Sequence, residues 1–419
     1  MMRFKTIPLL LMAVALCGPQ VWAQTTPEQY TKGDAPSASG KILTLSEAMD
    51  AAFNLNPQLS AAKNNFGASK GLVDQAGLLP NPSLDVSVDD HQRATRTTTT
   101  MLSMPIELGG KRSARTKAAQ LSSELAGRDY DVAKSEIKTS VLSRFYAVAI
   151  AQETLRVNQD MAEVAVGALR VAQKRVDSGK APPLERNRAD IELTKAQLEV
   201  RQAENDLNVA RRELSLLWGD PIPKFDLVRA NIDDLPPRRT LDELRSALLD
   251  SPRMAAGRLA LEVSKAELNV EKSKRYPDIT VSGGVARDNE VGRNKAQFGV
   301  SLPLPIFDRN QGNVYAATMQ TYKAQDVYRE LEARLSADLV IAASTYDLAI
   351  ASATEYRQSV IPTSQKAYEG ARKGFEAGKV GYLEVLDAQR TLSQGNISYL
   401  TTLSRAASAR AEIERILGQ

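Results

Sequence analysis

Three carboxylates stand at matching places beyond two glycines of this 419-residue chain. Glu185 and Glu384 each follow a glycine, Gly179 or Gly378, by six positions, and Asp387 follows the second glycine by nine. A carboxylate just inside a helical hairpin is most often a solvated charge, or one that lies favourably at a helix N-terminus. If several copies of the chain surround an axis, the same side chains would form acidic rings at a constriction, which favours cations. The residues alone leave both interpretations open.

Other chemistry is sparse in this chain. His91 is the only histidine and Cys17 the only cysteine, so a transition-metal site built from imidazole and thiolate ligands is nearly excluded. No nucleophile-elbow motif occurs, and the glycines and lysine at 109–112 lack the spacing of a phosphate-binding loop. The 54 basic and 50 acidic residues are too closely balanced for a nucleic-acid-binding protein. We therefore expect no enzyme, no cofactor, no bound metal and no nucleic-acid partner.

The N-terminal residues predict export. Arg3 and Lys5 precede an apolar run at 7–16, and small residues follow it, so residues 1–23 are expected to be a secretory signal peptide. Ordinary cleavage there would remove Cys17 and leave a mature chain without cysteine. No later stretch suggests a transmembrane helix, so any entry into a membrane should use the strands of a closed barrel.

The rest of the chain is an internal duplication. Gly179 and Gly378 are 199 positions apart, and the same spacing separates Gly219 from Gly418 at the ends of the two downstream helices. A repeat of about 200 residues is much longer than a solenoid repeat, so it indicates two similar halves of one pseudo-symmetric body. The expected segments are a flexible N-terminal arm at 24–43, a first half at 44–218, a connector at 219–239 and a second half at 240–417.

Each half is expected to contain a strand pair, a very long helix and a returning helix. Leu84, Val86 and Val88 alternate with polar residues, which is typical both of a transmembrane barrel strand and of a half-buried soluble hairpin. Pro362 should kink the second long helix. The expected strands are 82–90 and 98–105 in the first half and 278–287 and 296–303 in the second. The expected long helices are 110–178 and 312–377, and the expected returning helices are 182–217 and 380–417.

Local signals mark the short helices and the returning helices. Thr44 and Thr240 are each followed three residues later by a glutamate, which is the capping-box pattern that starts a helix. Along the first returning helix, alanine and a large aliphatic residue alternate at heptad spacing, which predicts coiling around neighbouring helices. The alanines are Ala189, Ala196, Ala203 and Ala210, and the aliphatic residues are Leu193, Val200, Leu207 and Leu214. Any long antiparallel coiled coil would show the same heptads.

Three stretches resemble the outer-membrane efflux protein family, the TolC-like channels, and in particular its cobalt–zinc–cadmium resistance branch. Ser301–Gly312 (SLPLPIFDRNQG) and its first-half partner Ser103–Arg112 (SMPIELGGKR) are similar to that branch where a strand enters a long helix. Phe375–Ala388 (FEAGKVGYLEVLDA) is similar to the family's periplasmic tip. The resemblance covers nearly the whole mature chain, from Leu43 to Leu417.

The resemblance implies an α+β, TolC-like fold. Long antiparallel helices would form a periplasmic α-barrel, and four strands per chain would enter a twelve-stranded transmembrane β-barrel shared by a homotrimer. The protein would lie in the outer membrane, in contact with its lipid, and extend into the periplasm. It would be the passive exit duct for divalent heavy-metal cations, joined by a periplasmic adaptor (membrane fusion protein) to an inner-membrane pump of the resistance–nodulation–division (RND) class.

Carried onto this sequence, the family's pattern places Glu384 and Asp387 at the tip constriction, with Glu185 as the first-half equivalent of Glu384. Arg188 stands where the second half has Asp387, so a doubled acidic ring is not expected at that level. The turns that face the adaptor would be Gly179, Lys180, Gly378 and Lys379.

Two other functions stay open. A channel for drug or protein export would share the architecture and differ only in cargo. A soluble periplasmic coiled-coil scaffold or adaptor would explain the heptads but not the alternating strands. The residues alone permit a barrel closed by three chains or by two, and they do not identify the partner proteins or the resting state of the gate. The cargo does not follow from them either, because no residue pattern here coordinates a metal.

Overall fold

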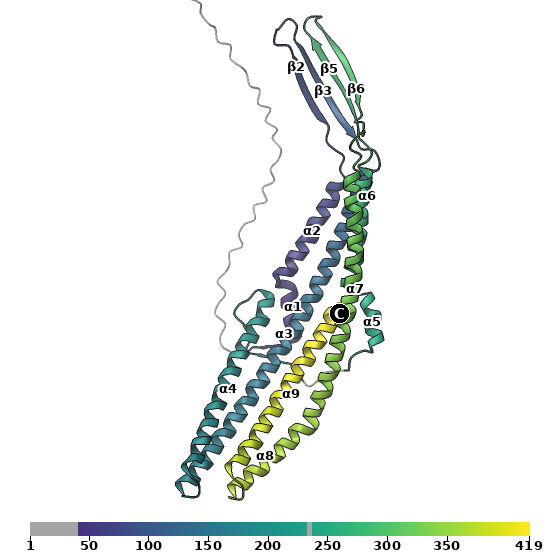
Figure 1. Ribbon diagram of the computed structural model, residues 1–419. Helices are drawn as coiled ribbons and strands as arrows, with labels where there is room; N and C mark the ends of the chain where they lie inside the picture. The colour runs from purple at the N-terminus through teal and green to yellow at the C-terminus, as the bar shows by residue number, and fades with distance from the viewer. Residues whose placement is uncertain (1–40, 233–236) are drawn as a thin grey trace, which may run out of the picture. The chain divides into compact units, whose positions relative to one another are not determined.

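The structure is a computed structural model that describes residues 41–232 and 237–419 (Figure 1). The expected signal peptide, nearly all of the expected arm at 24–43, and residues 233–236 of the connector lie outside the described residues. The chain from Gly40 to Gln419 forms one compact unit. Its α-helices are α1 (Leu45–Leu55), α2 (Pro57–Gly77), α3 (Lys111–Asp177), α4 (Pro183–Ser215), α5 (Leu241–Leu249), α6 (Pro252–Ser273), α7 (Gln311–Glu355), α8 (Ile361–Glu376) and α9 (Tyr382–Leu417). Its strands are β1 (Ile42–Leu43), β2 (Ser83–Asp89), β3 (Thr97–Ile106), β4 (Leu227–Val228), β5 (Ile279–Asp288) and β6 (Arg293–Ser301).

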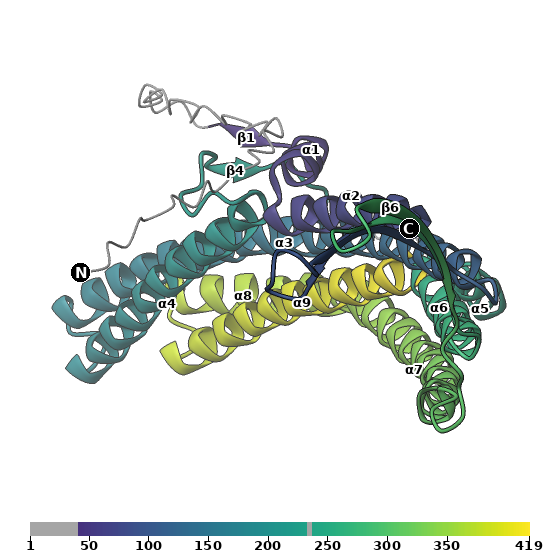
Figure 2. The same ribbon diagram turned by 90° about the horizontal axis from the view of Figure 1, so that it is seen from above.

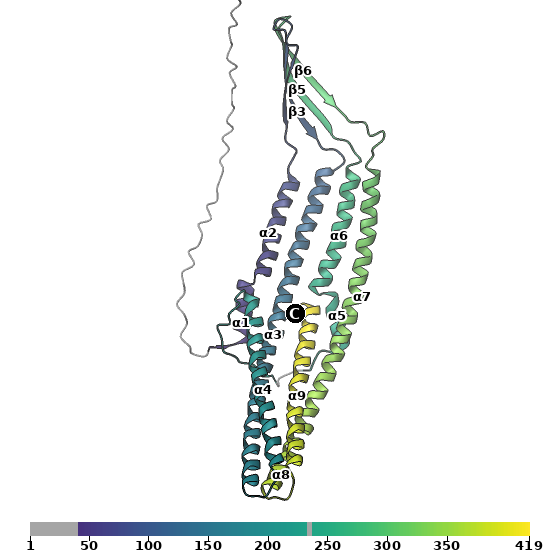
Figure 3. The same cartoon turned by 60° about the vertical axis from the view of Figure 1, so that its left-hand side comes forward.

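The helices of this unit form two layers that share α3. In the layer next to the four long strands, α2, α3, α6 and α7 lie side by side in that order (Figure 3). In the layer that ends at the two glycine turns, the order is α4, α3, α9 and α8 (Figures 1 and 3). The helix α3 has 67 residues and is therefore about 100 Å long at 1.5 Å per residue, which is why it belongs to both layers.

Side-chain caps set the starts of the short helices. The backbone N–H of Thr44 donates to the Glu47 carboxylate over 2.8 Å, and the backbone N–H of Glu47 donates to the Thr44 hydroxyl over 3.3 Å. The same reciprocal pair occurs between Thr240 and Glu243 at the start of α5. The two predicted capping boxes are therefore confirmed, and each stabilises the start of a helix by satisfying backbone donors that have no partner within it.

The predicted heptad seam of the first returning helix is buried at five of its eight positions, and Leu193, Val200 and Ala210 are half-buried. Ala189, Ala196 and Ala203 are buried, as are Leu207 and Leu214. Because alanine is small, α4 can approach α3 closely along this seam while the leucines fill the space between them.

The second long helix is interrupted. A π-helical segment, Tyr356–Val360, separates α7 from α8, and Pro362 follows at the start of α8. Proline has no N–H and its ring clashes with the carbonyl four residues earlier, so a wider turn just before it relieves both problems. The expected kink at Pro362 thus takes the form of a π-helical turn.

One helical stretch differs from the sequence-based expectation about membrane spans. Within the described residues, Gln311–Glu376 is long and apolar enough by composition to cross a bilayer. Core helices pass the same test, and this stretch packs against α6 and α9. Alanines at positions such as Ala342, Ala343 and Ala349, buried against α9, supply part of its apolar character.

A small region beside the helical layers holds α1, β1 and β4 (Figure 2). The strands β1 and β4 pair in parallel, with Ile42 opposite Leu227 and Leu43 opposite Val228. Leu43 and Val228 are buried together with residues of α1 and α3. The sequence predicted an arm to residue 43 and an irregular connector in place of these two strands. Strands of two residues are too short to show an alternating pattern, so the sequence did not reveal them.

Candidate functional site

The four long strands form one antiparallel sheet in the order β2-β3-β5-β6, so a hairpin from each half meets at the central β3–β5 pair. The register aligns one face across all four strands, and one row of that face consists of Leu84, Leu102, Gly283 and Phe298. The exposed large apolar side chains of this face are Leu84, Val86, Val88, Leu102, Met104, Ile106, Val281, Val285, Phe298 and Val300. The opposite face carries serine, threonine and charged side chains, including those of Asp85, Arg293 and Lys295.

This exposed apolar face decides between the two interpretations of the strands. A half-buried soluble hairpin would cover its apolar side, whereas Phe298 is 89% exposed and Val300 is 74% exposed. A contiguous uncovered apolar surface indicates an interaction surface, and strands with apolar residues on their outer side are typical of membrane barrels. The outer edges of β2 and β6 also have no strand beside them in the described residues.

Glycine allows the two hairpins to pair closely at the centre of the sheet. A Cβ atom on Gly284 would lie 2.1 Å from the backbone carbonyl oxygen of Thr100 on β3, so no other residue fits there. A Cβ atom on the neighbouring Gly283 would lie 3.7 Å from the Phe298 ring, which is an ordinary contact. The Phe298 ring therefore covers the space beside Gly283 on the apolar face, as aromatic residues do beside glycine in other sheets.

At the other end of the unit, the two glycine turns have nearly the same geometry. Gly179 and Gly378 adopt left-handed conformations with φ of 72° and 70°. The N–H of the following lysine, Lys180 or Lys379, donates over 2.8 Å to the carbonyl of the residue five positions earlier. This is the hydrogen bond that closes a helix end with a left-handed glycine. Both lysines are exposed, so the two turns present matching basic tips.

The predicted site carboxylates differ in their surroundings. Glu384 and Asp387 are exposed on the first turns of α9, and neither has an ion-pair partner in the described part of the chain. Gly381 leaves room for Glu384, since a Cβ atom there would lie 2.8 Å from the Glu384 carboxylate oxygen. Glu185 is instead 13% exposed and accepts a hydrogen bond from Nε of Arg175 over 3.1 Å. The first-half and second-half carboxylates are thus equivalent in position but not in environment.

Arg175 also ties the two hairpins to each other. Its Nη1 donates to the backbone carbonyl of Phe375 over 3.2 Å, and its guanidinium lies 4.6 Å from the centre of the Phe375 ring. The position 199 residues later is Gly374, so the second half has no counterpart of this arginine. Sequence reasoning missed this contact, and the only signal that could have found it is the difference between Arg175 and Gly374.

A second contact joins the same two hairpins nearer the middle of the helices. Nη2 of Arg390 on α9 donates to the Glu192 carboxylate on α4 over 2.5 Å, and Lys195 approaches the same oxygen at 3.2 Å. Burial alone would raise the pKa of Glu192, but the hydrogen bonds and charges of Arg390 and Lys195 outweigh it and leave the pKa below its usual value. Burial raises the pKa of the nearby Tyr382 hydroxyl to about 12, so this side chain stays neutral.

Apolar packing completes the joint between the hairpin tips. Phe375 of α8 and Tyr382 of α9 stack at 5.7 Å between ring centres. They form one buried cluster with Ala172 of α3 and Ala189 of α4. The tip is therefore a single packed unit in this conformation, held by one cluster and two charged contacts.

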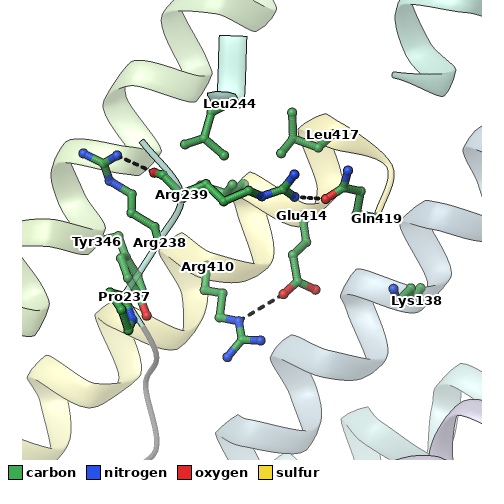
Figure 4. Close-up of a pocket in the computed structure, with 11 residues that line it drawn as sticks. Lys138, Pro237, Arg238, Arg239, Leu244, Tyr346, Arg410, Glu414, Leu417 and Gln419 are labelled. Carbon is green, nitrogen blue, oxygen red and sulfur yellow. Dashed lines mark hydrogen bonds and ion pairs between the residues drawn. The ribbon is translucent and has the colours of Figure 1, made fainter. Parts of the chain in front are cut away.

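A pocket of about 310 Å³ lies at the other end of α9, where α5, α7 and the connector meet (Figure 4). Three of its basic side chains have partners: Arg239 donates to Gln419, Arg410 pairs with Glu414 over 3.0 Å, and Arg238 pairs with Asp347 of α7. Lys138 of α3 also lines the pocket. The contacts of Arg239 and Arg238 join the connector to the last residue of the chain and to α7, which makes the pocket a structural joint. Within residues 41–232 and 237–419, no three acidic, histidine or cysteine side chains are grouped as metal ligands.

The fold and the two ends of the molecule define a class of protein. The family model described as "Outer membrane efflux protein" matches residues 48–220 and 244–419, and the chain therefore belongs to that family of efflux channels, which are not enzymes. Over all 419 residues, and over the whole of both chains, it is 42% identical to the cobalt-zinc-cadmium resistance protein CzcC of Cupriavidus metallidurans.

Solved structures show the same fold at low sequence identity. A membrane protein from Pseudomonas aeruginosa aligns with a TM-score of 0.78 and 19% identity over 93% of this chain and 96% of that one. The channel protein CusC aligns with a TM-score of 0.76 and 18% identity over 94% of this chain and 96% of that one. The fold is TolC-like, as the resemblance implied.

Proposed function

We propose that this protein is the outer-membrane duct of a tripartite RND-type efflux pump and that it passes divalent heavy-metal cations of the cobalt, zinc and cadmium kind. The single observation that carries this proposal is the 42% identity to CzcC across the whole of both chains. The uncovered apolar face of the sheet supports a position in the outer membrane. Residues 1–23 would direct export and be removed.

A homotrimer follows from the edges of the unit. In each layer, one edge belongs to the first half (β2, α2 or α4) and the opposite edge belongs to the second half (β6, α7 or α8). One head-to-tail contact, repeated by rotation, would therefore close the sheet and both helical layers together. Open strand edges are not tolerated in lipid, and three copies of the four-stranded sheet would give a closed twelve-stranded barrel.

In such a trimer, Glu384 and Asp387 would line the constriction at the periplasmic tip. Their exposure and lack of an ion-pair partner in the described residues support this role, because each would form a ring of three carboxylates that favours cations. Glu185 would belong to the same level, with its charge held by Arg175. Arg188, exposed at the place equivalent to Asp387, argues against a doubled ring there.

The partners would act at the turns. Gly179, Lys180, Gly378 and Lys379 form the exposed ends to which a periplasmic adaptor would bind, and the adaptor would connect them to the inner-membrane RND pump. The duct itself would be passive. Opening would require the adaptor to loosen the two contacts between the hairpins, Arg175 with Phe375 and Arg390 with Glu192.

The cargo is tested in cells. Deletion of the gene should raise sensitivity to zinc, cobalt and cadmium salts and increase cellular metal content, and the wild-type gene on a plasmid should reverse both. Sensitivity to drugs with unchanged metal tolerance would contradict the metal cargo and favour the drug-export channel.

The pore residues are tested in planar bilayers. The double variant Glu384→Gln/Asp387→Asn should lower the cation preference and weaken block by multivalent cations. Glu163→Gln provides a matched control, because Glu163 is an exposed carboxylate on α3 away from the turns. Unchanged selectivity in the double variant would mean that these carboxylates do not line the pore.

A further inference from the structure

The segment between β6 and α7 continues the uncovered apolar surface beyond the strands. Leu304, Ile306 and Phe307 are 72%, 62% and 90% exposed. The matching stretch of the first half, Ser103–Arg112, is two residues shorter than Ser301–Gly312 and contains no phenylalanine. The exposed ring of Phe307 therefore has no counterpart in the first half, and it adjoins the apolar face of the sheet.

The sheet has the length that places this segment at a membrane surface. Strands β3 and β5 have ten residues each, which is about 33 Å at about 3.3 Å per residue. Tilted by about 40°, as barrel strands are, they span about 25 Å, the height of the apolar band of such barrels. The helices α2, α3, α6 and α7 all join the sheet at one end, and there Tyr276, Phe307 and Tyr315 are exposed (Figure 3). Exposed aromatic rings at the ends of strands are typical of the boundary between lipid and water.

Basic residues gather around the same end of the sheet. The four segments that join helices to strands here contain seven basic and four acidic side chains. These segments are residues 76–82, 107–115, 271–278 and 302–310. Two of the acidic groups already pair with basic ones, Asp278 with Lys111 over 2.8 Å and Glu107 with Arg115 over 2.6 Å. The remaining excess of positive charge matches the negative charge of lipid phosphates.

A pocket of about 420 Å³ joins the apolar segment to the end of α6. Arg275 lines this pocket together with Leu304 and Phe307, so a cation lies beside the exposed apolar side chains. In the repeat, Pro277 matches Pro82, and the place of Arg275 is therefore taken by Pro80 in the first half. The combination of arginine and phenylalanine thus occurs once in each chain.

The other charges of the pocket have partners within the chain. Lys274 pairs with Glu271 over 2.6 Å, and Oδ1 of Asp308 accepts the backbone N–H of Asn310 over 2.8 Å. In the part of the chain that the structure describes, Arg275 has no ion-pair partner and is exposed. Its guanidinium is therefore the group of this pocket that can meet an external anion.

We propose that Arg275 and Phe307 bind a phospholipid of the periplasmic leaflet, with the guanidinium on the lipid phosphate and the ring against the acyl chains next to the head group. A guanidinium can donate two parallel hydrogen bonds to phosphate oxygens, which makes arginine suited to this contact. An anionic lipid such as phosphatidylglycerol should be preferred, because the ammonium of a zwitterionic head group competes with arginine for the phosphate. The proposal rests on the part of the proposed function that places the sheet in the outer membrane, and not on the cargo.

Quenching of tryptophan fluorescence by brominated lipids tests the contact. Phe307→Trp places an indole at the site, and the remaining native tryptophan is Trp218, since Trp22 lies in the expected signal peptide. Protein extracted from outer membranes is reconstituted into vesicles of phosphatidylglycerol and phosphatidylcholine in equal amounts. Bromine is carried near the head-group end of the acyl chains of one lipid or of the other. With a charge-assisted hydrogen bond to the phosphate, the site should hold phosphatidylglycerol about ten times as often as phosphatidylcholine, and brominated phosphatidylglycerol should quench correspondingly more.

Two further variants and one anion separate the parts of the proposal. Arg275→Gln in the same background should remove the preference and leave the indole in contact with lipid. Arg201→Gln, the same change at an exposed position of α4 far from the sheet, should keep the preference (Figure 1). Inorganic phosphate should not displace the lipid, because the lipid is also held by its acyl chains. Loss of the preference on addition of phosphate would assign the site to free phosphate and overturn the proposal.

The remaining outcomes distinguish this site from the channel itself. Equal quenching of Phe307→Trp by both lipids would mean lipid contact without a phosphate site, and would overturn the proposal. An unquenched Phe307→Trp beside a quenched Phe298→Trp would mean that protein, such as a second copy, covers the ring; the proposal would then fail and the proposed function would stand. A Phe298→Trp that neither lipid quenches would refute the membrane position of the sheet, and the lipid site with it.

Discussion

Replacing Arg175 with alanine should loosen the tip of the channel. This side chain is 21% exposed and makes three contacts: an ion pair with Glu185, a hydrogen bond to the Phe375 carbonyl, and a cation–π contact with the Phe375 ring. Two of the three involve Phe375 across the joint between the hairpins, so the substitution removes a link and leaves Glu185 without its partner.

The size of the effect can be estimated from these contacts. A hydrogen bond from a charged group contributes about 1.5–3 kcal/mol, and a partly exposed cation–π contact adds about 0.5–1 kcal/mol. Because Arg175 keeps some contact with solvent, we take the lower end and expect about 2 kcal/mol per chain between the tied and untied arrangements. Since each 1.4 kcal/mol is a factor of ten, the ratio of untied to tied arrangements should rise roughly 30-fold in each chain, which favours the open tip.

Single-channel recording in planar bilayers measures this ratio. Arg175→Ala should show a larger mean conductance or a larger open fraction than the wild type. Arg372→Ala is the control, because Arg372 pairs with Glu376 on the same helix and both side chains are nearly half exposed. Such a pair contributes about 0.3–0.5 kcal/mol, so its loss should change the recordings little. A conductance of Arg175→Ala equal to that of the wild type, in a protein that still forms trimers, would refute the reasoning.

Three further predictions concern the second hairpin contact and the sheet. The pKa of Glu192 is lowered in the folded protein, so the ion pair of Glu192 with Arg390 stabilises the tip above the ordinary pKa of 4.5 and is lost as the pH falls below that value. Channel conductance should therefore rise as the pH falls below 4.5, and Glu192→Gln should abolish this rise. Gly284→Ala should disrupt the β3–β5 pairing and abolish heat-resistant oligomers on gels, because the new Cβ atom would overlap the backbone carbonyl of Thr100. Gly283→Ala should be tolerated, because its Cβ atom would make only an ordinary contact with the Phe298 ring. Phe298→Arg should reduce the amount of protein in outer membranes by placing a charge on the lipid-facing side, at a cost of about 2–4 kcal/mol near the bilayer centre, whereas Gln297→Arg on the opposite face should not.

The sequence predicted the features that depend on local residue patterns. The reciprocal Thr44–Glu47 and Thr240–Glu243 caps were found because the interacting groups are three residues apart. The glycine turns were found because Gly179 and Gly378 adopt a left-handed conformation that glycine allows at little cost. The TolC-like fold followed from the resemblance of whole stretches rather than from any single residue.

The features that sequence reasoning missed depend on contacts between distant segments. The β1–β4 pair joins residues far apart in the chain through only two residues on each side. The π-helical turn before Pro362 was expected only as a kink, because the residue type fixes where a helix is disturbed but not how the backbone adjusts.

The candidate site was predicted in position but not in chemistry. Glu185, Glu384 and Asp387 lie on the first turns of α4 and α9, as their spacing from the glycines predicted, and their place at a constriction stays a prediction. Their different environments arise from Arg175, whose partners come from both hairpins. A side chain that acts between two halves of a duplication cannot be recognised from either half alone.

The native mass of the protein extracted from purified outer membranes in mild detergent tests the central claim most directly. The account predicts a complex of three chains, recovered from the outer membrane. A single chain recovered from the soluble periplasmic fraction would contradict it, because neither the shared barrel nor the tip constriction could then form.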